Sequence, residues 1–164
     1  TPEKKKDLQL FAIGVRESIL KPIHSAKSGH PGGSLSAADY LTCLYQNELR
    51  IDPKQPRDEN RDRFVLSKGN VAQPNATLAL SDFFSEENLL RLRHIAAHLQ
   101  GHPNMNTTPP SVEMSTGSLG QGAAVGMAEG SKHLRKVLRV YTLLGDAQAE
   151  GAARHMTPTI FMIS

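Results

Sequence analysis

Two of the histidines stand in glycine- and proline-containing segments, where they could hydrogen-bond a substrate or transfer protons. His30 lies in residues 28–33 (SGHPGG) and His102 in residues 100–103 (QGHP). Glycine lets the backbone come close to a ligand, and proline stiffens the turn. Imidazole changes its charge near neutral pH and suits acid–base work. For His30 the alternative is a turn between two helices with an incidental histidine, and the residues alone leave both open.

A glycine-rich segment, residues 117–122 (GSLGQG), is predicted to open a helix. The free N–H groups and the dipole of a helix N-terminus can face a phosphate group. The segment superficially resembles a dinucleotide fingerprint, but it does not follow a predicted strand, so we reject that interpretation. Close packing of the helix through its glycines remains the alternative to phosphate binding.

An acidic residue, Asp146, comes directly after the apolar run 137–144 and Gly145. The carboxyl ends of parallel strands are where α/β sheets bind ligands. A carboxylate there is a natural ligand for Mg²⁺ or Ca²⁺, which take oxygen donors. Glu150 is a second acid nearby. A helix N-cap is the alternative role for Asp146.

A further pair, His94 and His98, is spaced four residues apart on a predicted helix, as in some zinc sites. No Cys or Glu completes a zinc-protease pattern, so the sequence disfavours zinc. His102 lies beyond Gly101 and need not join the pair.

The segments that must position these residues alternate between helical and apolar strand patterns, which favours α/β with a mainly parallel sheet. Apolar periodicity and capping residues predict the helices, and continuous apolar runs predict the strands. The predicted helices are 3–27, 34–49 with Ser34 or Ser36 as cap, 71–80, 85–99, 117–133 and 148–156, and the predicted strands are 63–67, 137–144 and 159–163.

The composition sets limits on the function. With 164 residues and 38% hydrophobic content, the chain can bury one sizeable core. A net charge of +3 is too small to imply nucleic acid, and we see no membrane-length apolar run and no signal peptide. Cys43 is the only cysteine, which fits a reducing, cytoplasmic setting, and its apolar neighbours predict an inert core thiol.

Five segments in order resemble the N-terminal, diphosphate-binding domain of transketolase. They are residues 28–33 (SGHPGG), 62–69 (DRFVLSKG), 99–103 (LQGHP), 115–122 (STGSLGQG) and 144–146 (LGD), and the resemblance covers about residues 10–151. It implies a three-layer helix-sheet-helix, thiamine diphosphate-binding fold. Because the chain ends in a strand-like run, we expect residues 1–164 to be a single, incomplete domain, either an N-terminal fragment or a subunit.

The resemblance also implies an activity. Transketolases transfer a two-carbon ketol unit from a ketose phosphate to an aldose phosphate, with thiamine diphosphate and Mg²⁺ (or Ca²⁺), in the pentose phosphate pathway. A pyrimidine-binding domain or subunit supplies the acid that activates the cofactor, usually across a homodimer, so we expect this chain to be inactive alone. By position, His30 and His102 are the implied catalytic residues and Asp146 the metal ligand. The implied cofactor-binding residues are Asn70, Gly117, Leu119, Asp146, Ala147 and Glu150.

The chain departs from the family pattern at two positions that bear on activity. Asn70 stands where the family has histidine, and an amide can donate a hydrogen bond but is not protonated near neutral pH. Ala147 replaces a glycine, at a cost of about 1 kcal/mol if the backbone there needs positive φ. The segment to Glu150 is one residue short of the family pattern, and the helix after Gly122 is about two residues short.

These departures leave two alternatives to an active part of an enzyme. One is a catalytically inactive interaction or regulatory module that keeps the fold. The other is that the natural chain is longer than 164 residues, which an intact mass would decide. A related thiamine diphosphate enzyme, such as deoxyxylulose phosphate synthase or a pyruvate dehydrogenase component, is a further alternative that a panel of donor substrates would separate.

Overall fold

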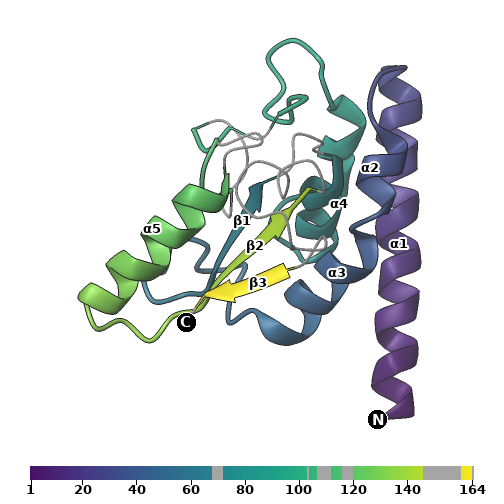
Figure 1. Cartoon of the computed structure of the whole chain (residues 1–164). Helices are drawn as coiled ribbons and strands as arrows, with labels where there is room; N and C mark the ends of the chain where they lie inside the picture. Colours follow the sequence, from purple (N-terminus) through teal and green to yellow (C-terminus); the bar gives the residue numbers. More distant parts are fainter. Residues whose placement is uncertain (68–71, 103, 107–111, 116–119, 146–159, 164) are drawn as a thin grey trace.

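A three-stranded sheet forms the centre of the fold in the computed structural model, which describes residues 1–67, 72–102, 104–106, 112–115, 120–145 and 160–163 (Figure 1). Strands β1 (Arg63–Ser67) and β2 (Val140–Leu144) are parallel, and β3 (Ile160–Ile163) pairs antiparallel with β2. The strand order is β1-β2-β3. All three predicted strands are present. The direction of β3 departs from the parallel pattern, because a short apolar run does not encode the direction of its strand.

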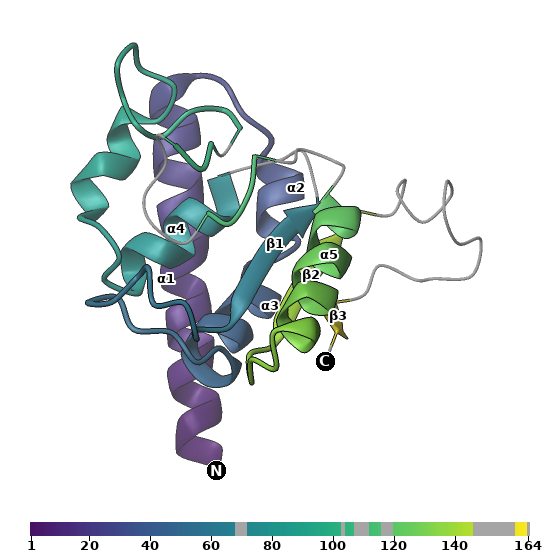
Figure 2. The ribbon, with the colours of Figure 1, turned by 90° about the vertical axis from the view of Figure 1, so that its left-hand side faces the viewer.

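Helices cover both faces of the sheet, as predicted for a three-layer α/β fold. Helix α5 (Gly120–His133) packs through Ala124 and Ala128 on Val65 and Val140. On the other face, Phe64 and Tyr141 contact a cluster from the helices, which contains Ala37, Leu41, Leu44, Tyr45 and Leu78. Figure 2 shows α5 against the sheet, with α1 on the far side of the helical layer. Because successive strand side chains point to opposite faces, β1 and β2 each contribute to both cores.

Helix α1 (Pro2–Ala26) confirms the first predicted helix. Its first turn contains Pro2, and the Thr1 hydroxyl accepts a hydrogen bond of 3.4 Å from the Lys4 N–H. Lys27 ends it in a left-handed conformation. The predicted apolar face is buried, with Val15 and Ile19 packed on Ala38 and Ala76. None of the described helices is long and apolar enough to cross a membrane.

The second predicted helix is wrong in its start and its continuity. The structure has α2 (Pro31–Leu35), α3 (Ala38–Cys43) and a π-helix, η1 (Leu44–Glu48). The helical backbone begins at Pro31, because proline suits a first turn where its missing N–H is not needed. Cys43 is exposed, contrary to the predicted core thiol. Leu41, Thr42, Leu44 and Tyr45 occupy the buried face, and the helical period turns Cys43 outward.

The predicted helix 85–99 is also wrong. Only a 3₁₀ segment, η2 (Glu86–Arg91), forms after Ser85, and Arg93 and Ala96 then adopt φ values of 63°. The predicted helix rested on its apolar periodicity. An irregular turn buries the same leucines in one cluster instead, namely Leu89, Leu92 and Leu99. His94 and His98 therefore do not share a helix face, and His98 packs edge-on against Phe84. Helix α4 (Ala72–Leu80) confirms its prediction.

Candidate cofactor-binding site

The carboxyl ends of β1 and β2 meet the start of α5. Ser67 pairs in register with Leu144, so both strands end level with each other. The Ser67 side chain is buried, and its hydroxyl accepts a 3.2 Å hydrogen bond from the backbone N–H of Gln121. This bond fixes the first turn of α5 against the end of β1. Three segments of the predicted site thus converge at one edge of the sheet, where α/β folds bind ligands.

All six predicted cofactor-binding residues lie outside the described residues. They are Asn70, Gly117, Leu119, Asp146, Ala147 and Glu150. Their described neighbours in the sequence are Ser67, Gly120 and Gly145, which belong to the converging segments. A 14-residue helix that begins beside this edge offers N–H groups to an anion, which fits a diphosphate. Asp146 follows the end of β2 by two residues in the sequence, and a carboxylate is the kind of oxygen donor that a hard divalent ion requires.

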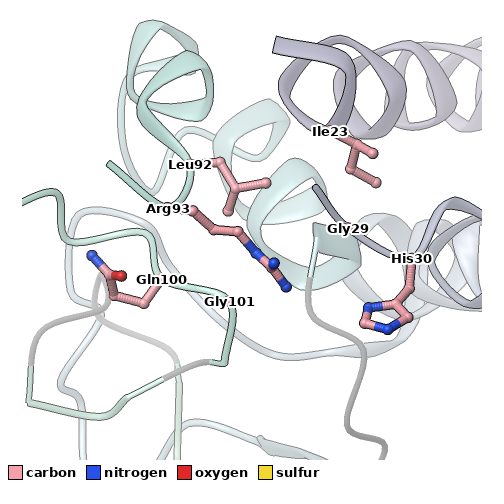
Figure 3. Close-up of a pocket in the computed structure, with 7 residues that line it drawn as sticks. All are labelled: Ile23, Gly29, His30, Leu92, Arg93, Gln100 and Gly101. Atoms are coloured by element: carbon pink, nitrogen blue, oxygen red, sulfur yellow. The ribbon is translucent and has the colours of Figure 1, made fainter. Parts of the chain in front are cut away.

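A pocket brings together the two loops that carry the predicted catalytic histidines (Figure 3). The pocket is small and open to solvent. Its lining residues are Ile23, Gly29, His30, Leu92, Arg93, Gln100 and Gly101. His30 is the exposed N-cap of α2, and exposed His102 directly follows Gly101. Figures 1 and 2 both place α2 beside the carboxyl ends of β1 and β2.

Arg93 is a pocket residue that the sequence patterns missed. The apolar periodicity of residues 85–99 predicted a helix, which gave this arginine no particular role. In the structure its left-handed backbone and the hydrogen bond from its N–H to the Leu99 carbonyl, 2.8 Å long, turn the side chain into the pocket. No pattern in the neighbouring residues predicts the left-handed backbone of Arg93.

At the opposite end of the strands, Asp62 holds β1 and β2 together. Its side chain is 0% exposed and accepts hydrogen bonds from the backbone N–H groups of Arg50 (3.0 Å) and Arg139 (2.8 Å). Both guanidinium groups also donate to it. Burial alone would raise the pKa of Asp62, but the hydrogen bonds from Arg50 and Arg139 outweigh burial and lower it. The carboxylate thus fixes the strand register that brings Ser67 level with Leu144.

A second buried carboxylate, Glu113, anchors the segment that leads to Gly117. It forms ion pairs with Arg61 and Arg63, and its side chain is 8% exposed. Burial, and then the charge of Glu113, raise the pKa of the nearby Tyr45 hydroxyl far above its usual value. Residues 112–115 are therefore tied to the start of β1 by charge as well as by packing.

Comparison with known proteins agrees with this arrangement. Residues 10–146 match the family model described as "Transketolase, thiamine diphosphate binding domain". The chain belongs to the transketolase family. Human transketolase is 40% identical over 155 residues, which are 92% of this chain and 25% of that protein. The transketolase structure from Leishmania mexicana superposes with a TM-score of 0.82 at 28% identity, over 88% of this chain and 24% of that one.

A shorter relative in this transketolase family is named as one subunit of its enzyme. This apulose-4-phosphate transketolase subunit of Phocaeicola vulgatus is 38% identical over 149 residues, or 88% of this chain. The chain spans about half of that relative (52%) and about a quarter of human transketolase. The family match covers His30, His102 and the segments on both sides of the sheet edge.

Proposed function

We propose that the chain is the diphosphate-binding part of an enzyme that transfers a two-carbon ketol unit from a ketose phosphate to an aldose phosphate. The observation that carries the proposal is the convergence of the ends of β1 and β2 with the start of α5, in a chain whose residues 10–146 match a thiamine diphosphate-binding domain. On this proposal residues 1–164 act as one domain, and the rest of the cofactor cleft comes from another domain or subunit.

The proposed roles follow from the position of each residue. Thiamine diphosphate, when bound, supplies a carbon nucleophile and stores the resulting carbanion. The first turn of α5 would bind the diphosphate through N–H groups, and Asp146 would be a ligand of Mg²⁺ or Ca²⁺. Asn70, Gly117, Leu119, Ala147 and Glu150 contribute to the cofactor cleft. His30 and His102 hydrogen-bond the sugar phosphate and move protons.

The partner is a pyrimidine-binding domain or subunit, which provides the acid that activates the cofactor. The subunit designation of the Phocaeicola vulgatus relative supports a split enzyme of this kind. We further propose that the assembled enzyme works in the cytoplasm as a dimer of such units. The test is to mix the chain with a pyrimidine-binding partner from the same source, thiamine diphosphate and Mg²⁺, and to measure transfer from a ketose phosphate to an aldose phosphate.

Transfer is expected only in the complete mixture, because on this proposal the activating acid belongs to the partner. The chain without its partner and the complex with His30→Ala serve as controls. The first should be inactive, and the second should show strongly reduced but measurable transfer. A folded complex that gives no transfer with any ketose phosphate donor would contradict the proposal.

A second function is an inactive interaction module, which Asn70 and Ala147 favour because both replace residues of the family pattern. Isothermal titration calorimetry separates the two proposals. Saturable, Mg²⁺-dependent binding of thiamine diphosphate to the assembled complex would rule out the inactive module as stated. Absence of binding to a folded complex would favour it.

Asn70→His is expected to raise cofactor affinity or turnover by about five- to tenfold in the assembled complex. A protonated imidazole makes a charge-assisted hydrogen bond to a phosphate oxygen, which is roughly twice as strong as the neutral bond of an amide. Calorimetry measures the affinity and steady-state kinetics the turnover. Asn106→His, the same change at a position far in sequence from the sheet-edge segments, is the control and should have no effect. An unchanged affinity and turnover would mean that Asn70 does not limit the site.

A further inference from the structure

The guanidinium group of Arg93 joins two loops that are far apart in the sequence. Its Nη1 donates a hydrogen bond to the Ser28 hydroxyl, two residues before His30. Its other side lies against Gly101, one residue before His102. Figure 3 shows the side chain crossing the pocket between Gly101 and Gly29. Among the described residues, Arg93 thus contacts both the His30 loop and the His102 loop.

The contact with Gly101 depends on the absence of a side chain. A Cβ at Gly101 would lie 3.0 Å from both Nε and Nη2 of Arg93. Such a distance is tighter than nearly all real contacts of a Cβ, so the guanidinium would have to move. Glycine at this position therefore lets the planar group pack directly on the backbone that leads to His102.

The His30 loop also packs on helix α1. Gly29 has a φ of 154°, and a Cβ there would lie 3.1 Å from Cγ1 and Cγ2 of Ile23 on α1. The loop is therefore packed on α1 at Gly29 and tied to Arg93 at Ser28. Arginine suits this place better than lysine, because its flat group can stack on one loop while donating to the other.

We propose that Arg93 is a positioning residue that sets the placement of His30 relative to His102. The proposal rests on the proposed function, since it concerns the two histidines assigned to the sugar phosphate. Proton transfer requires heavy atoms within hydrogen-bond reach, and displacement by about 1 Å can cost on the order of 100-fold in rate. By contacting both loops as a bridge, Arg93 would fix the position of the His30 imidazole relative to that of His102.

A double-mutant cycle in the assembled complex tests this role. Arg93→Gln should lower kcat/KM about tenfold, mainly through kcat, while in a His30→Ala background it should change kcat/KM less than twofold. Arg93→Lys should recover only part of the loss. Arg91→Gln, an exposed arginine two positions away on η2, is the matched control and should leave the rate unchanged. Equal losses in both backgrounds would overturn the proposal.

A second measurement does not need activity. Side-chain NMR signals of His30 and His102 in the full chain should both shift in Arg93→Gln, whereas the signal of His133, at the end of α5, should not. Ser28→Ala and Gly101→Ala, which disturb one side of the bridge each, should shift the same two signals if Arg93→Gln does not fold. Unmoved His30 and His102 signals would overturn the bridge. Missing transfer in the wild-type complex, with these shifts present, would instead contradict the proposed function.

Discussion

Replacing Asp62 by alanine is expected to lower the free energy of unfolding by about 3 kcal/mol. Removal of one partner from a buried charge network typically costs about 3–5 kcal/mol. The lower end applies here, because Arg50 and Arg139 have side chains 52% and 31% exposed and can turn to water. Their backbone N–H groups, which donate to Asp62, lose their acceptor at the start of both strands.

Urea unfolding at neutral pH measures the loss, and Asp39→Ala is the matched control. Asp39 pairs with Arg16 at 2.7 Å, but its side chain is 70% exposed. Exposed ion pairs contribute about 0–1 kcal/mol, so the control should differ little from wild type. Similar losses for the two variants would show that burial and the two backbone hydrogen bonds at Asp62 do not matter as argued.

The contribution of Asp62 is also expected to depend on pH. Its pKa is lowered in the folded protein, because its hydrogen bonds outweigh its burial. A carboxylate with a lowered folded pKa stabilises the protein above its unfolded pKa of about 3.9 and loses this effect as the pH falls through the folded value. The difference in unfolding free energy between wild type and Asp62→Ala should therefore shrink as the pH falls below about 5. A constant difference would contradict this assignment.

The elements that the sequence predicted well are those in which local pattern and tertiary packing agree. Residues 63–67 contain the apolar run 64–66, which both cores of the three-layer fold require, and β1 has these bounds. Helix α1 has a capping threonine, an early proline and one apolar face. The predicted helix 85–99 failed because its leucines reach the core from an irregular turn, which satisfies the same apolar pattern. Periodicity alone does not distinguish these two solutions.

The candidate site divides in the same way. Glycine-rich segments and strand ends pointed to a site at the carboxyl edge of the sheet, where Ser67, Gln121 and Leu144 lie. The role of Arg93 depends on its left-handed backbone and on a contact with Ser28, and neither follows from neighbouring residues. A sequence pattern could have predicted the hydrogen-bond network of Asp62. An acid and an arginine precede two parallel strands at equivalent positions, since Arg63 pairs with Val140.

Removal of the carboxylate at Asp146 is expected to weaken Mg²⁺-dependent thiamine diphosphate binding by more than about 100-fold. Loss of a residue that merely orients a metal ligand typically costs about 10–100-fold, and Asp146 is proposed as the ligand itself. Asp146→Asn keeps the size of the side chain and one oxygen, so it tests charge. Calorimetry on the assembled complex, with Mg²⁺ and separately with Ca²⁺, measures the affinity.

Two controls make the Asp146 result specific. Asp58→Asn changes an exposed acid in the loop before β1 and should leave the affinity unchanged. Glu150→Gln changes the neighbouring acid, and its smaller expected effect would place Asp146 as the main ligand. If Asp146→Asn bound the cofactor as wild type does, with unchanged dependence on Mg²⁺, the ion would not be held here. The diphosphate would then have to be held without a metal, by N–H groups at the start of α5 other than that of Gln121, which donates to Ser67.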